Sequence, residues 1–374
     1  MTIPVMKPWL DEEEAAAAAA AVASGWIAQG PRVESFERAF AAWMGAAEAV
    51  AVSSCTAGLH LALLLAGVGP GDEVVVPSLS FIATANAVRY VGVQPVFADV
   101  DPVTGNVTAK TVEPVLGQRT RALLAVHQAG VPADIGELRQ LCDPWGVPVL
   151  EDAACAAGSQ LGDQPVGTGA LVAAWSFHPR KVLTTGEGGM LTTDDPQWAA
   201  RARQLREHGM SVSAAERHRS GRLVLEQYLE TGFNYRMTDV QAAIGLVQLS
   251  KLERMVQRRR ELADGYRQRL RGITGLQLVQ DPPHGQTNYQ SFWVVLPDDF
   301  PVGRDEVLRA MLAAGVSCRR GIMAAHLEPA YAGTTADLPV TERLTARSLI
   351  LPLFHTMTEA EQDTVAGVLQ ELNG

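Results

Sequence analysis

Seven short apolar segments that alternate with helical patterns constrain the fold of this chain more than any other feature of its sequence. The segments are rich in Val, Ala and Leu, and they lack the strict apolar–polar alternation of a strand with one exposed face. Strands of this kind, separated by helices, predict an α/β fold with a mostly parallel seven-stranded sheet covered by helices. The predicted strands span residues 48–54, 72–77, 94–100, 121–128, 147–152, 172–177 and 188–194.

The second half of the chain follows a different pattern. A long charged helix is predicted over 240–273, and a smaller α+β region follows it. A chain of 374 residues is long enough for two domains. We therefore expect residues 1–248 to form an N-terminal segment and a large domain, and residues 249–374 to form a small C-terminal α+β domain. The long helix is expected to connect the two.

Charge and cysteine usage exclude several classes of protein. The net charge of −10 argues against nucleic-acid binding, which needs basic surfaces. The four cysteines show no C-x-x-C pairing, so we expect no zinc site, no disulfide framework and a reducing compartment. The alanine run at 15–21 is too short and too weakly apolar to span a bilayer, and no secretory signal pattern opens the sequence. A cytoplasmic protein without metal or membrane contacts is expected.

The ends of the predicted strands are where a ligand is expected to bind, because ligands of parallel sheets lie at the carboxyl ends of the strands. After strand 48–54, Ser54 and Thr56 precede a helix whose free N–H groups form a natural phosphate cradle; a plain helix cap is the alternative. After strand 72–77, Phe81 is placed to stack on a planar ligand, although a core position is the alternative.

Two further strand ends carry charged groups. Glu151 and Asp152 end strand 147–152, and a carboxylate held there suits a cation such as a protonated ring nitrogen; capping of the next segment is the alternative. Lys181 follows strand 172–177 and Ser176, and it is one of only four lysines among 31 basic residues. A lysine presented in a crevice can lose its proton by desolvation and attack a carbonyl to form a Schiff base. A solvated surface lysine is the alternative.

A phosphate cradle, an aromatic face, a carboxylate and a lysine together meet the requirements of pyridoxal 5′-phosphate. Its phosphate needs N–H and hydroxyl donors, its ring needs a face partner, its protonated ring nitrogen needs an anion, and its aldehyde needs an amine. The sequence lacks the G-x-x-x-x-G-K-[ST] spacing of a P-loop, so the glycine-rich turn after Lys181 is not read as a nucleotide-binding loop.

The chain resembles the DegT/StrS-type (DegT/DnrJ/EryC/StrS) sugar aminotransferases, which are pyridoxal-phosphate enzymes of fold type I. The resemblance covers nearly the whole length and rests on eight segments in order, each of which is weak alone. They are the opening region from "KPWLDEEE" to "AVAVSS", then "GPGDEVVVPSLSFIATANA", "VFADVDPVTGNV", "VHQAGVPADI", "LEDAACAAGS", "SFHPRKVLTTGEGGM", "GFNYRMTDVQAAIGLVQLSKLE" and "LPVTERLTARSLILPL".

The resemblance implies a role for each matching residue. Lys181 would hold the cofactor as a Schiff base and later move protons, Asp152 would pair with the ring nitrogen, and Phe81 would stack on the ring. The phosphate would be held by Thr56, Ala57 and Ser176. Asn234 in "GFNYRM" would reach the phosphate of the neighbouring subunit, which requires a homodimer with shared active sites.

Two positions depart from the family pattern. Cys55 stands where the family often has glycine or alanine, and a phosphate contact through the backbone should survive that change. Cys155 stands where the family has glutamine or histidine near the ring hydroxyl, and cysteine is a weak hydrogen-bond donor. His326 and Tyr331 fall where the family has residues on the substrate side, with a purely structural role as the alternative.

The activity implied by the resemblance is transfer of an amino group from glutamate or glutamine to a keto sugar. The turn "TTGEGG" after Lys181 favours a nucleotide-linked (dTDP-type) 4-keto-6-deoxyhexose aminated at C4, in deoxyaminosugar biosynthesis for an antibiotic or a surface glycan. A 3-keto sugar or a ketocyclitol of the scyllo-inosose type is the alternative. Lysine at 181 argues against the family's sugar dehydratases, which have histidine there. A non-catalytic regulator and another fold type I enzyme, such as a decarboxylase or racemase, are further rivals.

Overall fold

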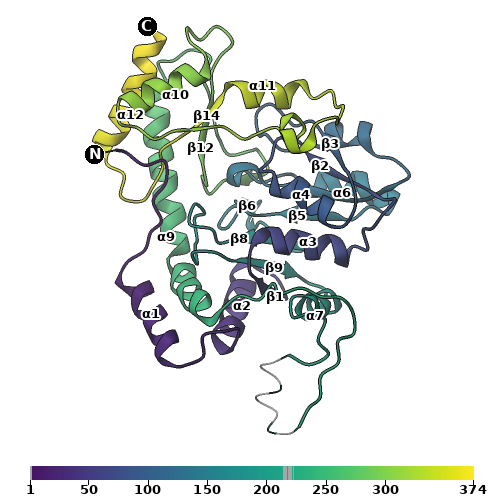
Figure 1. The fold of residues 1–374 in the computed structure, drawn as a ribbon. Coiled ribbons are helices and arrows are strands. Elements are labelled where there is room, and N and C mark those ends of the chain that lie inside the picture. Colours follow the sequence, from purple (N-terminus) through teal and green to yellow (C-terminus); the bar gives the residue numbers. More distant parts are fainter. Residues whose placement is uncertain (1, 214–216, 218–220, 222) are drawn as a thin grey trace.

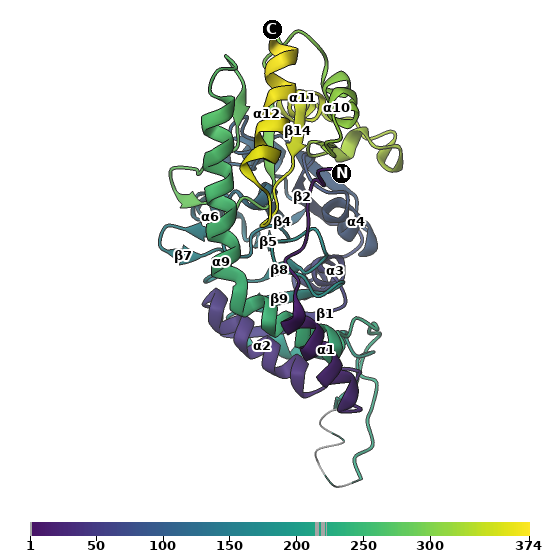
Figure 2. The ribbon, with the colours of Figure 1, turned by 90° about the vertical axis from the view of Figure 1, so that its left-hand side faces the viewer.

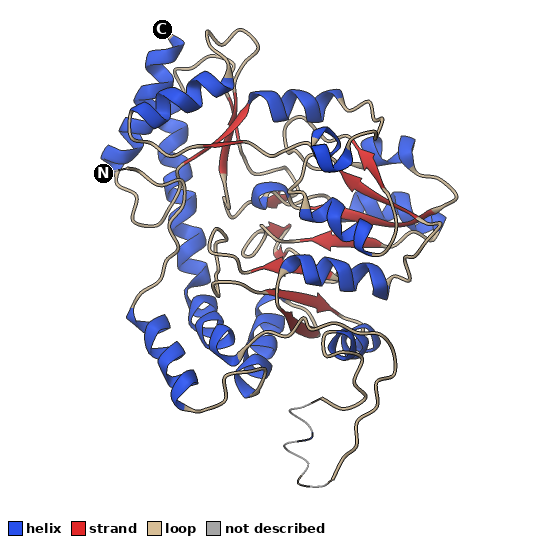
Figure 3. Ribbon diagram, in the orientation of Figure 1, coloured by secondary structure: helices blue, strands red, loops and turns tan. Residues whose placement is uncertain are grey.

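The central feature of the structure, a computed structural model that describes residues 2–213, 217, 221 and 223–374, is a mixed sheet of seven strands (Figures 1 and 3). Within these residues the strand order is β1-β9-β8-β5-β4-β2-β3. The strands are β1 (Glu48–Val52), β2 (Glu73–Pro77), β3 (Pro95–Ala98), β4 (Thr120–Val126), β5 (Val149–Asp152), β8 (Ala173–Ser176) and β9 (Gly189–Thr193).

The directions of the strands confirm the predicted α/β class. β3, β2, β4, β5 and β8 run parallel to one another, whereas β9 runs antiparallel to both β8 and β1. Each observed strand lies within one of the seven segments predicted from the sequence, apart from β4, which begins one residue earlier. The apolar runs are continuous because both faces of the sheet are covered.

The helices begin where the sequence supplies caps. Asp11 and Thr238 form capping boxes at α1 and α9, and the Ser54 side chain accepts a hydrogen bond at the start of α3. The helices are α1 (Glu12–Ala23), α2 (Pro31–Met44), α3 (Cys55–Leu65), α4 (Ala83–Tyr90), α5 (Ala109–Val112), α6 (Ile135–Cys142), α7 (Pro196–Leu205), α9 (Asp239–Leu270), α10 (Arg304–Ala313), α11 (Pro339–Arg347) and α12 (Glu359–Asn373). None of them, within the described residues, combines the length and hydropathy needed to cross a membrane.

Helices cover the sheet on both faces. On one face α3, α4 and α7 pack against side chains such as Val50, Val74 and Leu124. On the other face α2 and α9 pack against Ala51 and Trp175 near β1 and β8, while α6 and the C-terminal region cover the strands farther along. Figures 1 and 2 show the sheet and the helices on its two faces from perpendicular directions. The carboxyl ends of β5 and β8 face the C-terminal region.

Helix α9 connects the large sheet to a second, smaller one. Its 32 residues span about 48 Å at 1.5 Å per residue. It contacts α1 and α2 near its start and α12 near its end (Figure 1). The smaller sheet has the order β10-β12-β14-β13 and is antiparallel throughout. Its strands are β10 (Gln277–Leu278), β12 (Phe292–Val295), β13 (Arg319–Arg320) and β14 (Ser348–Leu351).

The domain boundary predicted near residue 248 lies inside α9 and stays a prediction. The first residues of the chain, grouped with the large domain in that prediction, pair with the C-terminal region: Ile3 forms a bridge with Val316, and the Leu353 amide donates to the Val5 carbonyl. A third, short sheet of β11 (Gly285–Gln286), β6 (Gln160–Leu161) and β7 (Gln164–Pro165) also joins the two parts. The contacts between the two parts are therefore extensive.

Candidate active site

A cavity of about 330 Å³ lies at the carboxyl ends of the parallel strands, between the large sheet and the C-terminal region. Six of the residues predicted from the sequence line it, and each follows a strand or begins a helix. They are Thr56, Phe81, Asp152, Cys155, Ser176 and Lys181. The walls from the C-terminal region include Arg259, Gln290 and Arg319. Residues from across the chain therefore converge at the sheet edge where α/β proteins bind ligands.

Lys181 is held by bonds to the backbone on both sides of it. Gln290 is buried, and its side-chain oxygen accepts from the Val182 amide at 2.8 Å while its side-chain nitrogen donates to the Arg180 carbonyl at 2.6 Å. The Lys181 Nζ donates to Cys155 Sγ at 3.1 Å. The peptide that carries the lysine is thus fixed from the C-terminal region, and the amine points into the cavity beside a thiol.

The surroundings of Lys181 favour its protonated form, contrary to the expectation that desolvation removes the proton. Burial by itself lowers the pKa of Lys181, as predicted from the sequence, but Cys155, Cys55 and Asp152 act in the opposite direction. The net result is a pKa above the ordinary 10.5. The lysine is therefore held as an ammonium by these neighbours, and it has to lose that proton before it can attack a carbonyl.

Asp152 is a buried carboxylate that fits a cationic ring nitrogen. Its Oδ2 accepts from Thr84 Oγ1 at 2.8 Å, and its Oδ1 accepts from the Ala154 amide at 3.1 Å. Burial raises its pKa above the ordinary 3.8, and no basic side chain in the described residues forms an ion pair with it. A buried carboxylate without a cation is costly, and a protonated ring nitrogen at this position would offset that cost.

The neighbouring acid, Glu151, points elsewhere. It is buried, and its carboxylate lies 3.2 Å from His127 Nε2 and 3.8 Å from the Arg139 guanidinium. Successive side chains of a strand point to opposite faces, so only one acid of the pair reaches the cavity. Asp152 is the acid that lines the cavity, and one of its oxygens also accepts from the Ala154 amide of the next segment, as the capping alternative expected.

The start of α3 provides donors for a phosphate. Ser54, Cys55 and Thr56 line the cavity, and the amides of the first helical residues have no partner within the helix. Ser176 lines the same region at the end of β8. Gly189 allows β9 to approach this turn, because a Cβ there would lie 2.5 Å from the Ser54 carbonyl carbon. Small residues thus bring backbone donors close to the cavity.

Phe81 is exposed at the cavity and is not a core residue. Its side chain is 63% exposed and lines the cavity. An exposed aromatic ring beside a cavity gains most by stacking on a planar ligand. The core alternative considered for Phe81 is therefore not met.

Four residues named from the sequence do not line the cavity. The Ala57 amide donates to Ser54 Oγ at 3.1 Å, so this amide is already occupied by the helix cap. His326 is buried and bonds to Ser78 Oγ at 2.7 Å, and Tyr331 is buried and donates to Asn86 at 2.9 Å. The contacts of His326 and Tyr331 are those of the structural alternative. Asn234 is exposed and pairs with Glu207.

Gln290, Arg259 and Arg319 line the cavity but were not predicted from the sequence. Gln290 meets Val182 across 108 positions of the chain, and Arg259 and Arg319 lie in separate elements of the C-terminal region. The rule that ligands bind at strand ends identifies the cavity wall formed by the large sheet, but not the opposite wall formed by the C-terminal region.

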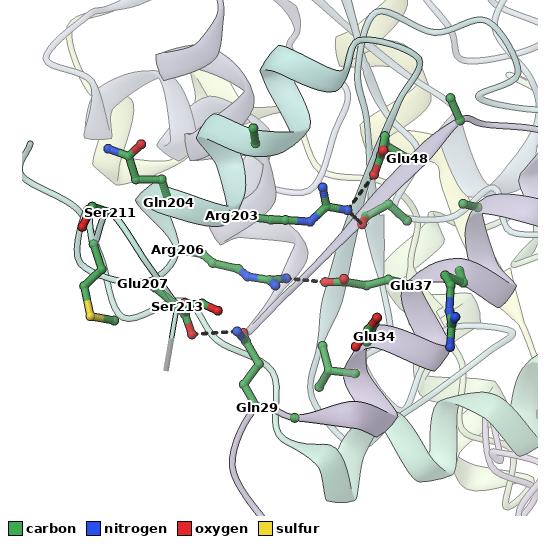
Figure 4. Close-up of a pocket in the computed structure, with 18 residues that line it drawn as sticks. Gln29, Glu34, Glu37, Glu48, Arg203, Gln204, Arg206, Glu207, Ser211 and Ser213 are labelled. Atoms are coloured by element: carbon green, nitrogen blue, oxygen red, sulfur yellow. Dashed lines mark hydrogen bonds and ion pairs between the residues drawn. The ribbon is translucent and has the colours of Figure 1, made fainter. Parts of the chain in front are cut away.

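A second, larger cavity of about 580 Å³ lies between α2, β1 and α7 (Figure 4). Its charged groups pair with one another: Arg203 lies 2.7 Å from Glu48, and Arg206 pairs with Glu37. The described residues that line it include no lysine. Its larger volume therefore does not make it the better candidate, because it lacks the groups for the chemistry.

Comparisons with known proteins agree with this geometry. The family model described as the DegT/DnrJ/EryC1/StrS aminotransferase family matches residues 8–370. The aminotransferase TlmJ from Streptoalloteichus hindustanus is 40% identical, over 99% of this chain and 98% of its own, with a TM-score of 0.91. DesI, solved in the presence of its TDP-sugar product, is 32% identical over 99% of this chain and 93% of its own, with a TM-score of 0.89.

A further similar structure bears on the cofactor. Spr1654 from Streptococcus pneumoniae has been solved in a PLP form and a PMP form; the PLP form is 25% identical over 100% of both chains, with a TM-score of 0.91. The cavity residues described above fit the same cofactor. The chain belongs to the DegT/DnrJ/EryC1/StrS aminotransferase family and is a pyridoxal-phosphate-dependent aminotransferase.

Proposed function

We propose that this enzyme transfers the amino group of glutamate or glutamine to C4 of a nucleotide-linked 4-keto-6-deoxyhexose. The observation that carries the proposal is the meeting of Lys181 Nζ and the unpaired, buried carboxylate of Asp152 in one cavity with a phosphate cradle. An amine for an aldehyde and an anion for a ring nitrogen, in a member of an aminotransferase family, support amino-group transfer.

The residues present fit the cofactor. Thr56, Ser176 and the backbone at the start of α3 would hold the phosphate, Phe81 would lie against the ring, and Asp152 would hold the ring nitrogen protonated. When bound, pyridoxal phosphate supplies an aldehyde that exchanges amino groups and a ring that withdraws electrons from the bonds being broken. Cys155, beside Lys181, would face the ring hydroxyl as a weak donor.

Lys181 does two kinds of work in this proposal. Its amine would hold the cofactor at the aldehyde and would be free for proton transfer once the amino donor is bound. In the first half-reaction Lys181 would remove the proton from the α-carbon of the amino donor. In the second it would deliver a proton to the sugar carbon that receives the amino group. A positioned amine that transfers a proton accelerates such a step by roughly 10²–10⁴-fold. Gln290 keeps the backbone of Lys181 in place during both half-reactions.

The choice of a nucleotide-linked sugar rests on two points. DesI, which is similar over nearly its whole length, was solved with a TDP-sugar product. The turn "TTGEGG" after Lys181 contributes Glu187 and Gly188 to the cavity, and this turn is the sequence feature that favours C4. Production of a deoxyaminosugar for an antibiotic or a surface glycan is the proposed role, in the cytoplasm.

A homodimer with shared active sites is part of the proposal. Asn234 is exposed, away from the cavity of its own chain, which suits a residue that serves the phosphate of a neighbouring subunit. The exposed apolar side chains nearby, Leu225, Tyr228 and Leu229, suit burial against a second copy.

Incubation with glutamate and dTDP-4-keto-6-deoxyglucose tests the proposal, with the product identified by mass and by NMR at C4. We expect a 4-amino sugar and 2-oxoglutarate in equal amounts, with Lys181→Ala as the inactive control. Amination only of a 3-keto sugar or of scyllo-inosose would replace the proposed acceptor. A deoxysugar product would indicate a dehydratase, and carbon dioxide release from an amino acid would overturn amino-group transfer.

A further inference from the structure

A thiol and an amine touch each other on the wall of the active-site cavity. The Nζ of Lys181 lies 3.1 Å from Sγ of Cys155, and both side chains line the cavity. The contact is made within one chain, and no group of a second subunit fits between two atoms at this distance. The family pattern has glutamine or histidine at position 155, so thiol chemistry beside the lysine is a property of this sequence.

A short segment of the C-terminal region holds both partners of this contact. The Asn288 Nδ2 donates to the Cys155 carbonyl at 2.8 Å, and Gln290 bonds to the peptides on either side of Lys181. The Gln290 amide in turn donates to Asn288 Oδ1 at 2.7 Å, and both of these side chains are buried. Two groups held in contact react with each other far more readily than the same groups free in solution.

The other three cysteines are poor targets for oxidation. Burial raises the pKa of Cys142 to about 11 and that of Cys318 to about 12. Cys55 lines the same cavity as Cys155, but burial and the nearby Asp152 raise its pKa well above the ordinary 9.0. The thiolate is the reactive form of cysteine, so these three thiols are expected to stay inert near neutral pH. Cys155 is only half-buried, at a cavity that admits small solutes.

We propose that Cys155 and Lys181 form a modification site, at which a hydroperoxide joins the two side chains through a reversible bond between sulfur and nitrogen. In the first step the sulfur takes one oxygen of the hydroperoxide and becomes a sulfenic acid. The O–O bond breaks, the sulfur gives up an electron pair to the hydroperoxide, and water or an alcohol leaves. Hydroperoxides are small enough to enter the cavity of about 330 Å³.

The second step needs no further oxidant. Sulfenic acids condense with nitrogen to give sulfenamides, and Lys181 Nζ is the nitrogen in contact with this sulfur. The N–S bond forms, the S–O bond breaks, and the hydroxyl leaves as water together with the proton of the ammonium group. Thiols reverse the link: one thiol attacks the sulfur and releases the amine, and a second thiol then frees Cys155 and leaves a disulfide of the two added thiols.

The cross-link takes away the amine that the cofactor needs. This consequence rests on the proposed function, in which Lys181 holds the cofactor at its aldehyde. In the resting holoenzyme the cofactor occupies the amine and thereby protects it. After the amino donor has reacted, Lys181 is free beside Cys155, so oxidation during turnover is expected to form the link and to stop the enzyme until a thiol reduces it.

Peptide mass mapping of the holoenzyme after brief exposure to hydrogen peroxide tests the proposal, with and without glutamate. With glutamate we expect the peptides of Cys155 and Lys181 to be joined, with a mass lower than their sum by a pair of hydrogen atoms. The joined peptides should separate on treatment with dithiothreitol. The oxidised enzyme should also fail to rebind pyridoxal phosphate, measured by absorbance, until it is reduced. Without glutamate the joined form should be scarce.

Three variants separate the two steps. Cys155→Ser should give no joined peptides. Cys55→Ser is the matched control from the same cavity, and it should form the link as the unaltered enzyme does. In Lys181→Ala the reaction should stop at the sulfenic acid, which dimedone labels at Cys155.

Two outcomes in the unaltered enzyme would overturn the inference. One is a disulfide between Cys55 and Cys155 in place of the link to Lys181. The other is a Cys155 that stays unoxidised, or that takes up oxygen without joining Lys181. Failure of the proposed function is distinguishable from both: borohydride would then place no pyridoxyl group on Lys181, and the link would form equally with and without glutamate.

Discussion

Replacement of Gln290 by alanine tests how the C-terminal region controls Lys181. The change removes the acceptor of the Val182 amide and the donor to the Arg180 carbonyl, at 2.8 and 2.6 Å in the structure. Val182 is buried, so its amide is left without a partner, at a cost of about 1–3 kcal/mol. The cost appears either as lower stability of the protein or as a shift of the peptide that carries Lys181.

The second outcome is expected to dominate the kinetics. If the full 1–3 kcal/mol enters the barrier, the half-reaction with glutamate slows by roughly 5- to 150-fold, since about 1.4 kcal/mol corresponds to a factor of ten. The assay is stopped-flow absorbance of the cofactor at saturating glutamate, together with denaturant unfolding of each variant. The loss should fall on kcat more than on KM, because Gln290 positions the amine rather than the donor.

Gln248 offers a matched control. It is buried, it lies on α9, and its side-chain oxygen accepts from the Thr184 amide of the same loop at 3.3 Å, but it does not touch the peptides that flank Lys181. Gln248→Ala should therefore destabilise the protein while it slows the half-reaction much less than Gln290→Ala. Equal rate losses in the two variants, or an unchanged rate in Gln290→Ala, would refute the positioning role.

Three other predictions follow from charges in the structure. Asp152→Asn should lower the rate of the glutamate half-reaction by several orders of magnitude while cofactor binding, measured by absorbance, is retained, and a rate near the original would contradict the pairing with the ring nitrogen. Cys155→Ala should lower the pKa of Lys181, because the raised pKa depends partly on this sulfur. The variant should then bind pyridoxal phosphate faster near neutral pH, and an unchanged dependence of the binding rate on pH would argue against the contact. Lys251→Met should cost about 3–5 kcal/mol in denaturant unfolding, because it leaves the buried Glu14 carboxylate without its cation at 2.9 Å. Burial raises the pKa of Glu14, but the bonds from Lys251 and other donors lower it more, so that the net pKa is below 4.5. The unaltered enzyme should therefore lose this stabilisation as the pH falls below 4.5. In Lys251→Met the free energy of unfolding should depend less steeply on pH in this acidic range.

The floor of the active site could be predicted from the sequence because its residues follow strands. The apolar runs locate the strands, and the parallel arrangement locates their carboxyl ends. Asp152 is the last residue of β5, and Phe81 and Lys181 lie in the loops that follow β2 and β8. Which of the two acids at 151 and 152 faces the cavity depends on the pleat, so the sequence alone left that choice to the family resemblance.

The opposite wall could not be predicted, since it depends on how the C-terminal region packs. Gln290 and Arg319 become neighbours of Lys181 only through contacts that span more than 100 positions. His326 and Tyr331 illustrate the converse: their position in a family segment suggested the substrate side, yet both lie in buried hydrogen bonds with Ser78 and Asn86. The proton affinity of Lys181 likewise depends on neighbours, above all on Cys155, and not on burial alone.

The most direct test of the account is reduction of the purified enzyme with borohydride in the presence of pyridoxal phosphate, followed by peptide mass mapping. The account predicts one pyridoxyl group per chain, located on Lys181, together with loss of the yellow imine absorbance on reduction. Label on another lysine, or none at all, would contradict it.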